Sequence, residues 1–223
     1  MFLPPLIWKK NPRAKRLSLR VDPTQRAVVI TLPSGASPEQ GLAFFQTQSH
    51  WISKALSELP PRAIETGQLP LEGHIVRLLR DPNAKGGVWL DQDGIHISGQ
   101  TEHHERRLKD FLKTLAIRRI SPSVTFYSRR MQLSLTRLTF RDTKTRWGSC
   151  TKEGHLMLNW RLLLAPAAIR DYVIVHELAH LQHFHHGPSF WALVDRYCPQ
   201  NIQGRKTAEL WLKTNGSTLL SII

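Results

Sequence analysis

The sequence predicts an α+β fold with a β-rich N-terminal part, residues 1–100, followed by a more helical part, residues 101–223. Short alternating or β-branched runs dominate the first hundred positions, whereas apolar residues recur with a helical period after position 101. A strongly apolar stretch late in the chain predicts a buried helix packed on a small antiparallel or mixed sheet. No low-complexity linker separates the two parts, so the boundary is soft and one continuous domain is the alternative.

Five short strands are expected before residue 100. They are predicted at 17–21, 27–32, 74–79, 88–90 and 95–97, between turn residues such as Asp22-Pro23. A helix is expected after the second strand, because Ser37, Pro38 and Gln40 match a capping box with proline at the first helical position.

The second part is expected to combine several helices with one pair of strands. Helices are predicted at 101–120, from Pro122 to about 132, from Pro166 to about 184, from Pro188 onward, and at about 206–213. Strands are predicted at 133–140 and 155–160.

The chain is basic, with 31 Lys and Arg residues against 17 acids and a formal charge of +14. This excess predicts attraction to polyanions such as nucleic acid, and the alternative is a solvated basic surface that only keeps the protein soluble. The densest groups are Lys9, Lys10, Arg13, Lys15, Arg16 and Arg20, and then Arg106, Arg107, Arg118, Arg119, Arg129 and Arg130. Neither a zinc finger nor a helix-turn-helix signature accompanies them.

Cysteine content and hydropathy favour a cytoplasmic protein. Cys150 and Cys198 are too few for a disulfide framework in a chain of 223 residues. The N-terminus does not match a secretory signal, and no run of about 18 apolar residues predicts a membrane span. We therefore expect a soluble cytoplasmic protein with no membrane partner.

The motif with the clearest chemistry is His176-Glu177-Leu178-Ala179-His180. Two histidines four residues apart lie on one helix face, so both imidazoles can bind one Zn²⁺. The glutamate beside the first histidine can serve as general base without binding the metal. The alternative is a pair of hydrogen-bonded core histidines with a salt-bridged glutamate. Because the surrounding helix is apolar nearly all round, unpaired histidine and glutamate would be costly there, which favours the metal.

A catalytic zinc usually has three protein ligands, so one more is expected. His183 lies a further turn along the helix and would have to reach back past His180. His186 follows His180 by six residues, and Gly187-Pro188 predicts a sharp change of direction there, so His186 is preferred over His183 and His185. Two distant acids, Asp195 and Glu209, remain alternatives.

Several segments together resemble one family. Residues 145–150 (TRWGSC), 158–161 (LNWR), the HELAH helix, 186–191 (HGPSFW) and 13–16 (RAKR) are similar to the YgjP-like metallopeptidases, relatives of the SprT and WLM zinc peptidases. This resemblance covers nearly the whole chain. It implies a zincin-like catalytic part, with zinc held by His176, His180 and His186 and with Glu177 catalytic. SprT and WLM peptidases act on proteins attached to DNA, which a cationic surface would suit.

Residues near the motif supply candidates for substrate binding. In zincin-type peptidases an edge strand pairs with the substrate backbone, and residues 155–160 are expected to form it. Asn159 and Trp147 are candidate substrate-binding residues, and a turn-capping asparagine and a core tryptophan are the alternatives. Cys150 is expected to be a buried thiol rather than a nucleophile or a metal ligand. Phe190 and Trp191 are expected to pack under the site, and Arg146, Arg161 and Tyr197 are candidates for stabilising an oxyanion.

The favoured function is a zinc-dependent metallopeptidase that hydrolyses peptide bonds by Glu-assisted attack of zinc-bound water, on peptide or protein substrates that include DNA-associated proteins. The first alternative is a basic nucleic-acid-associated protein whose zinc site is structural or catalytically idle. A metal-dependent hydrolase of another substrate class is the second alternative.

Overall fold

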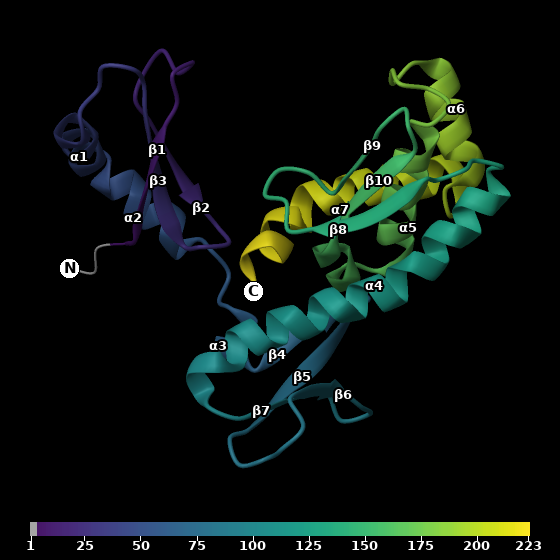
Figure 1. Cartoon of the computed structure of the whole chain (residues 1–223), viewed down its shortest axis with the longest axis horizontal. Coiled ribbons are helices and arrows are strands. Elements are labelled where there is room, and N and C mark those ends of the chain that lie inside the picture. The colour runs from purple at the N-terminus through teal and green to yellow at the C-terminus, as the bar shows by residue number, and fades with distance from the viewer. Residues whose placement is uncertain (1–3) are drawn as a thin grey trace. The chain divides into compact units, whose positions relative to one another are not determined.

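Two compact units make up the chain in the computed structural model, which describes residues 4–223 (Figure 1). The first unit comprises the described residues up to Arg62 together with Leu220–Ile222, and the second comprises Ala63–Leu219 and Ile223. The strands of residues 68–98 therefore belong to the same unit as the HExxH helix. Whether residues 1–100 and 101–223 fold as separate parts stays a prediction.

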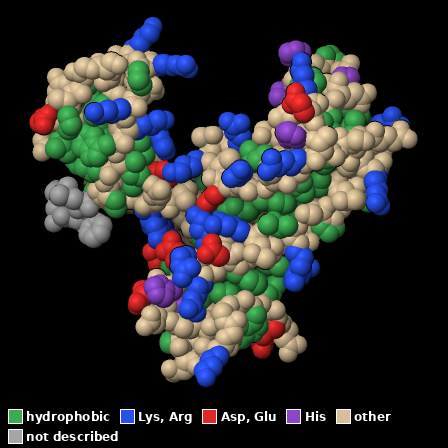
Figure 2. All heavy atoms as spheres, viewed as in Figure 1, with side chains coloured by type: hydrophobic (Ala, Val, Ile, Leu, Met, Phe, Trp, Pro, Cys, Tyr) green, Lys and Arg blue, Asp and Glu red, His purple; other side chains and the backbone are tan. Residues whose placement is uncertain are grey.

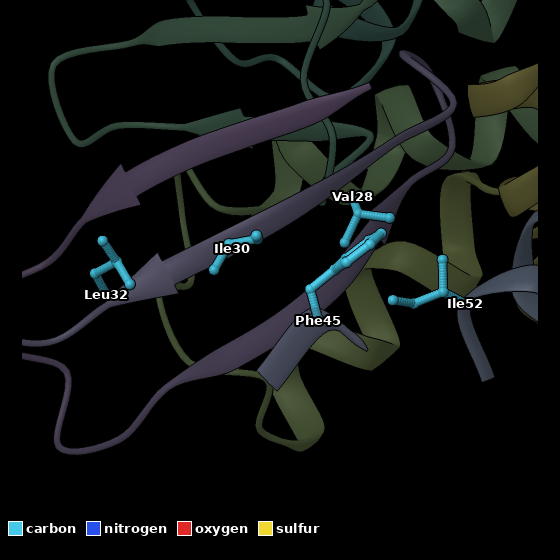
Figure 3. Close-up of a cluster of buried hydrophobic side chains, with 5 residues drawn as sticks. All are labelled: Val28, Ile30, Leu32, Phe45 and Ile52. Atoms are coloured by element: carbon cyan, nitrogen blue, oxygen red, sulfur yellow. The ribbon is translucent and has the colours of Figure 1, made fainter. Parts of the chain in front are cut away.

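The first unit is a three-stranded sheet with two helices on one face. The strands β1 (Leu6–Lys10), β3 (Ala27–Leu32) and β2 (Ser18–Asp22) lie in that order, with β1 parallel and β2 antiparallel to β3. Helices α1 (Pro38–Thr47) and α2 (Ser49–Ser57) supply the other half of the core. The buried cluster contains Val28, Ile30 and Leu32 from alternate positions of β3, and Phe45 and Ile52 from the helices (Figure 3). The predicted capping box is present, since Ser37 and Gln40 each bond the other's backbone N–H.

The second unit begins with a short helix and a four-stranded sheet. After α3 (Ala63–Thr66), the strands run in the order β4 (Gln68–Leu71), β5 (His74–Asp81), β7 (Ile95–Ser98), β6 (Val88–Leu90). The last three of these were predicted from their β-branched runs. Strands β1 and β4 were not predicted, because each includes or follows proline and lacks a clear alternation.

One long helix, α4 (His104–Arg130), follows a 3₁₀ turn (Thr101–His103). The prediction of a helix break before Pro122 is wrong. Proline inside a helix costs about 3 kcal/mol because its backbone donor is lost. Ile120, Val124 and Tyr127 continue the buried stripe beyond the proline, while Pro122 itself is exposed. Burial of these large side chains, each about 1.5–3 kcal/mol, outweighs the local penalty.

The second unit contains another sheet, of mixed topology, in its C-terminal half. Its strands run in the order β8 (Arg137–Arg141), β10 (His155–Asn159), β9 (Gly148–Cys150), with β10 parallel to β8 and antiparallel to β9. A 3₁₀ turn (Trp160–Leu164) leads to α5 (Ala167–Ala179), α6 (Pro188–Tyr197) and α7 (Asn201–Ser221). Helix α5 ends about five residues before the predicted 184, and α7 extends well beyond the predicted 206–213. The fold class is as predicted: α+β, with the HExxH helix packed on a small mixed sheet.

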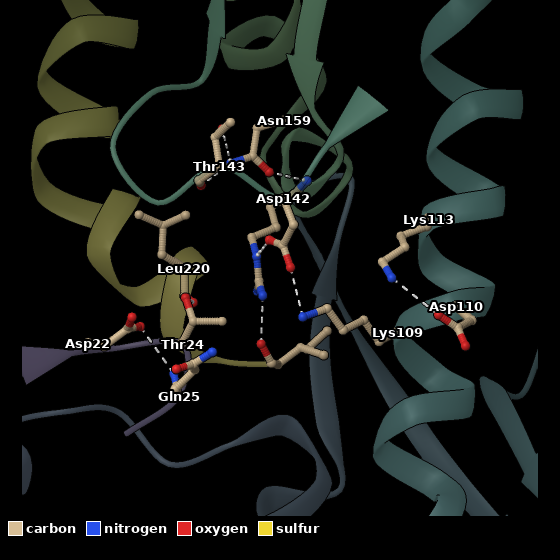
Figure 4. Close-up of polar contacts among 12 residues, drawn as sticks. Asp22, Thr24, Gln25, Lys109, Asp110, Lys113, Asp142, Thr143, Asn159 and Leu220 are labelled. Atoms are coloured by element: carbon tan, nitrogen blue, oxygen red, sulfur yellow. Dashed lines mark hydrogen bonds and ion pairs between the residues drawn. The ribbon is translucent and has the colours of Figure 1, made fainter. Parts of the chain in front are cut away.

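A buried arginine fixes the end of this sheet. Arg161 is completely buried, its Nε lies 2.8 Å from Oδ1 of Asp142, and its terminal nitrogens donate to the carbonyls of Leu219 (3.0 Å) and Ile223 (2.7 Å). Lys109 of α4 reaches the same carboxylate at 2.7 Å (Figure 4). These bonds join α4, the residue that follows β8 and the C-terminal end of the chain around the ion pair of Arg161 and Asp142. Within residues 4–223, no helix has the length and hydropathy needed to span a membrane.

Candidate metal centre

Helix α5 lies in the interior of the second unit, and the HExxH motif is at its C-terminal end. Most of its side chains are buried, including Ile169, Val173, Ile174, Val175 and Leu178. The helix ends at Ala179, and His180 follows as its C-cap with α-helical dihedral angles. His180 therefore keeps the helical spacing of one turn from His176, as the motif predicts.

Three histidines converge at the end of α5. The candidate ligand nitrogens of His176, His180 and His186 all lie within 4.8 Å of one another. The Nε2 atoms of His180 and His186 are 3.2 Å apart. The chain turns back between α5 and α6, where Gly187 caps α6 and Pro188 occupies its first turn. This reversal returns His186 to the helix end, and the structure thereby brings together the three histidines preferred from the sequence.

Phe190 forms the floor of the cluster. Its ring is completely buried, and its centroid lies 5.0, 4.8 and 4.6 Å from those of His176, His180 and His186. Trp191 borders the same cluster, with its ring centroid 5.5 Å from that of His186. The predicted packing of both aromatic residues under the site is confirmed.

Hydrogen bonding indicates which nitrogen of His180 is free. Its Nδ1 lies 3.2 Å from the carbonyl oxygen of His183, an arrangement that requires a proton on Nδ1. The lone pair is then on Nε2, which points at His186. His183 thus contributes its backbone carbonyl to the site, while its own ring and that of His185 lie outside the cluster.

Two of the three histidines, His176 and His180, are held in the neutral form that binds metals. Burial, followed by the charges of His180 and His186, lowers the pKa of His176 to about 4. Burial also lowers the pKa of His180. At neutral pH His176 and His180 are therefore uncharged, and each has a lone pair that can bind a cation.

The donor set fits a zinc ion. Catalytic zinc has three protein ligands and an open position, whereas structural zinc has four. The two acids considered as third ligands are engaged elsewhere: Asp195 binds Nε of Arg205 at 2.5 Å, and Glu209 binds Arg205 and Tyr172, both at 3.2 Å. Among the described residues they are not part of the histidine cluster.

Glu177 lies beneath strand β9. It is 8% exposed, and a Cβ added to Gly148 would stand 2.5 Å from its Cγ and 2.8 Å from its Oε1. Burial raises the pKa of Glu177 to about 7, against the opposing positive charge of Arg146. A pKa near neutrality suits a group that takes up and releases a proton in one catalytic cycle.

Strand β9, and not β10, is the edge strand beside the motif. The prediction that residues 155–160 form an edge is wrong, because β10 pairs with β8 on one side and β9 on the other. Among the residues that the structure describes, β9 pairs with β10 alone, and it packs against α5. The hydrophobic pattern of β10 identifies a strand but not its neighbours, which explains the error.

Comparison with known proteins then establishes the family. The YgjP-like metallopeptidase domain matches residues 15–215, which is most of the chain. The chain belongs to the YgjP-like metallopeptidase family. No curated protein matches this YgjP-like chain. The crystal structure of the metallopeptidase zymogen of Pyrococcus abyssi abylysin is similar, with 21% identity and a TM-score of 0.39 over 43% of this chain and 93% of that one. A similarity of that size carries no argument about function.

Asn159 and Trp147, the two candidate substrate-binding residues, have different surroundings in this YgjP-like domain. Asn159 is completely buried, and its amide nitrogen donates to the carbonyl and hydroxyl of Thr143 at 2.8 and 3.1 Å (Figure 4). Its oxygen accepts from the backbone of Arg161 at 3.0 Å. The indole of Trp147 lies against Gly216 of α7, 3.2 Å from the position of an added Cβ. The bond to Arg161 is the one expected of a turn-capping Asn159, whereas Trp147 is only partly buried and is not a core tryptophan. Substrate binding by either residue stays a prediction.

The remaining candidates are Cys150 and the three residues considered for stabilising an oxyanion, and their contacts differ. Cys150 is half-buried, and burial followed by the charge of Glu177 raises the pKa of its thiol to about 11, which keeps it protonated. Arg161 is engaged by the buried contacts described above. The ring of Tyr197 lies under Arg130 and Arg196. Arg146 is the oxyanion candidate whose charge acts on Glu177.

Two residues beside the motif were not singled out from the sequence. Gly148 allows β9 to approach Glu177, and no sequence pattern connects positions so far apart. Tyr172 precedes His176 by one helical turn and contacts its ring, a spacing that sequence inspection can detect. Burial, followed by the charge of Glu209, raises the pKa of Tyr172.

Proposed function

We propose that this chain is a zinc-dependent metallopeptidase with His176, His180 and His186 as metal ligands and Glu177 as general base. The observation that carries the proposal is the convergence of three imidazoles beside a buried glutamate. Three ligands leave one coordination position for water or substrate, which favours a catalytic over a structural zinc.

Zinc at this position would lower the pKa of water to about 7 and polarise a scissile carbonyl. Glu177 accepts the proton of the attacking water and passes it to the leaving amine. Its burial supports this role, because a carboxylate with a pKa near 7 both takes up and releases a proton near neutral pH.

The edge of β9 is the proposed binding site for the substrate backbone. Gly148–Cys150 has β10 on one side, and α5 lies against the same strand. An extended peptide added at the other side would bond to backbone groups and would be held with little dependence on its side chains. This mode fits hydrolysis of unfolded protein segments.

Removal and return of the metal tests the function. Protein purified without chelator or nickel affinity resin is expected to contain about one zinc per chain by plasma mass spectrometry. Dialysis against a chelator should abolish hydrolysis of an unstructured protein such as casein, and stoichiometric zinc should restore it. A chain that binds no zinc after reconstitution, or cleaves equally well without it, would rule out the proposal.

A polyanion-binding surface is a second candidate function. Residues 111–141 contain seven basic residues and no acid: Lys113, Arg118, Arg119, Arg129, Arg130, Arg137 and Arg141. Exposed Phe126, 55% accessible, lies with Pro122, Thr125, Arg129 and Arg130 around a groove of about 590 Å³. Figure 2 shows Lys and Arg side chains scattered over the surface of each unit, with fewer Asp and Glu side chains among them. Cations beside an exposed aromatic ring favour single-stranded nucleic acid, which offers phosphates and stacking bases.

Fluorescence anisotropy with labelled single-stranded and duplex DNA tests this surface. Binding is expected to weaken steeply with salt, and Arg129→Glu with Arg130→Glu should reduce it. The matched control is Arg77→Glu with Arg80→Glu, which makes the same charge change on β5. Equal losses in both double variants would indicate attraction to net charge alone, and no binding at moderate salt would exclude a nucleic-acid partner.

A further inference from the structure

The hydroxyl of Tyr172 lies between a metal-site histidine and an acid. Its oxygen is 3.4 Å from Nδ1 of His176 and 3.2 Å from Oε1 of Glu209. Tyr172 itself is buried, on the turn of α5 that precedes His176. The three groups form a chain that runs from α7 to the first histidine of the motif.

The direction of these hydrogen bonds follows from the number of protons. A tyrosine hydroxyl has one proton, and an ionised glutamate only accepts. The Tyr172 proton is therefore donated to Glu209, and the phenol oxygen accepts from His176. That arrangement places the His176 proton on Nδ1 and the lone pair on Nε2, as the His183 carbonyl does for His180.

Helices α6 and α7 hold Glu209 in place. Arg205 binds Glu209 at 3.2 Å and Asp195 at 2.5 Å. The Arg205 guanidinium lies 4.7 Å from the ring centroid of Trp191, which borders the histidine cluster. Arg205 therefore holds the Glu209 carboxylate in position. The Tyr172 hydroxyl connects that carboxylate to the ring of His176.

We propose that Tyr172 and Glu209 are positioning residues that orient His176 and fix its tautomer for metal binding. The inference rests on the proposed zinc site. Such outer hydrogen bonds raise the basicity of the ligand and reduce the number of ring orientations it samples before binding. A purely structural contact between α5 and α7 would stabilise the fold without changing the affinity for metal.

Tyr172→Phe removes the hydroxyl and keeps the ring. The zinc dissociation constant, measured by competition with a chromophoric chelator, is expected to rise about 10- to 100-fold. The matched control is Tyr127→Phe, since Tyr127 is also buried and donates to an acid, Asp171, at 3.3 Å. This control should change the zinc affinity less than about threefold, well below the effect of an outer-shell ligand partner. Unchanged affinity in Tyr172→Phe, or an equal loss in Tyr127→Phe, would overturn the inference.

A metal-independent readout separates this inference from the proposed function. In the zinc-free protein, ¹⁵N chemical shifts of His176 should report the Nδ1–H tautomer, and Glu209→Gln or Tyr172→Phe should produce a mixture of tautomers. Glu209→Gln also serves if Tyr172→Phe fails to fold. An Nε2–H tautomer in the wild-type protein would refute the role of Tyr172 whether or not zinc binds. Absence of zinc from a wild type with the Nδ1–H tautomer would refute the zinc site and, with it, the metal-binding purpose assigned to Tyr172.

Discussion

Glu177→Gln is expected to lower peptide hydrolysis by a factor on the order of 10²–10⁴ while the zinc content stays that of the wild type. Glutamine keeps the shape of the side chain but cannot take up the proton of the attacking water. The zinc is retained because the proposed ligands are the three histidines. Turnover of an unstructured protein and zinc content by plasma mass spectrometry, on the same preparation, measure the two quantities.

Gly148→Ala provides an independent test of the position of Glu177. The new methyl group would lie 2.5 Å from the Glu177 Cγ, so the carboxylate has to move while its chemistry is unchanged. Ser149→Ala, at the next position of the same strand, is the matched control and should retain activity. If Glu177→Gln remains active, the carboxylate is not the general base. If Glu177→Gln is inactive but Gly148→Ala remains active, the carboxylate is needed and still reaches the substrate from its displaced position.

His186→Ala is expected to lose the zinc, and its hydrolytic activity with it. Two histidines would remain, and the loss of affinity should exceed the roughly 10- to 100-fold effect of removing an outer hydrogen bond to a ligand. His186 is exposed, so the fold should remain stable and the effect should be confined to the metal.

His185→Ala is the matched control, because His185 is the neighbouring exposed histidine and lies outside the cluster. Zinc content and the thermal unfolding midpoint of both zinc-free variants separate metal loss from unfolding. Retention of zinc in His186→Ala, or equal loss in His185→Ala, would contradict the three-histidine site.

The sequence by itself determined the local features of this protein. A spacing of four residues places His176 and His180 on one helix face, and this depends only on helix geometry. Ser37 and Gln40 form a capping box because both partners lie within one turn. His186 was preferred because Gly187-Pro188 predicts a change of direction, although the sequence left His183, His185 and two acids as alternatives.

Tertiary structure decided which segments meet. The pattern of β10 predicts a strand, but its central position in the sheet depends on its partners β8 and β9. The edge strand beside the motif is therefore Gly148–Cys150. Pro122 remains inside α4 because burial on the opposite face outweighs a local penalty. Tyr172 reaches Glu209 across 37 positions of sequence. Helix spacing and capping follow from neighbouring residues, whereas sheet order, burial and hydrogen bonds between helices depend on the whole folded chain.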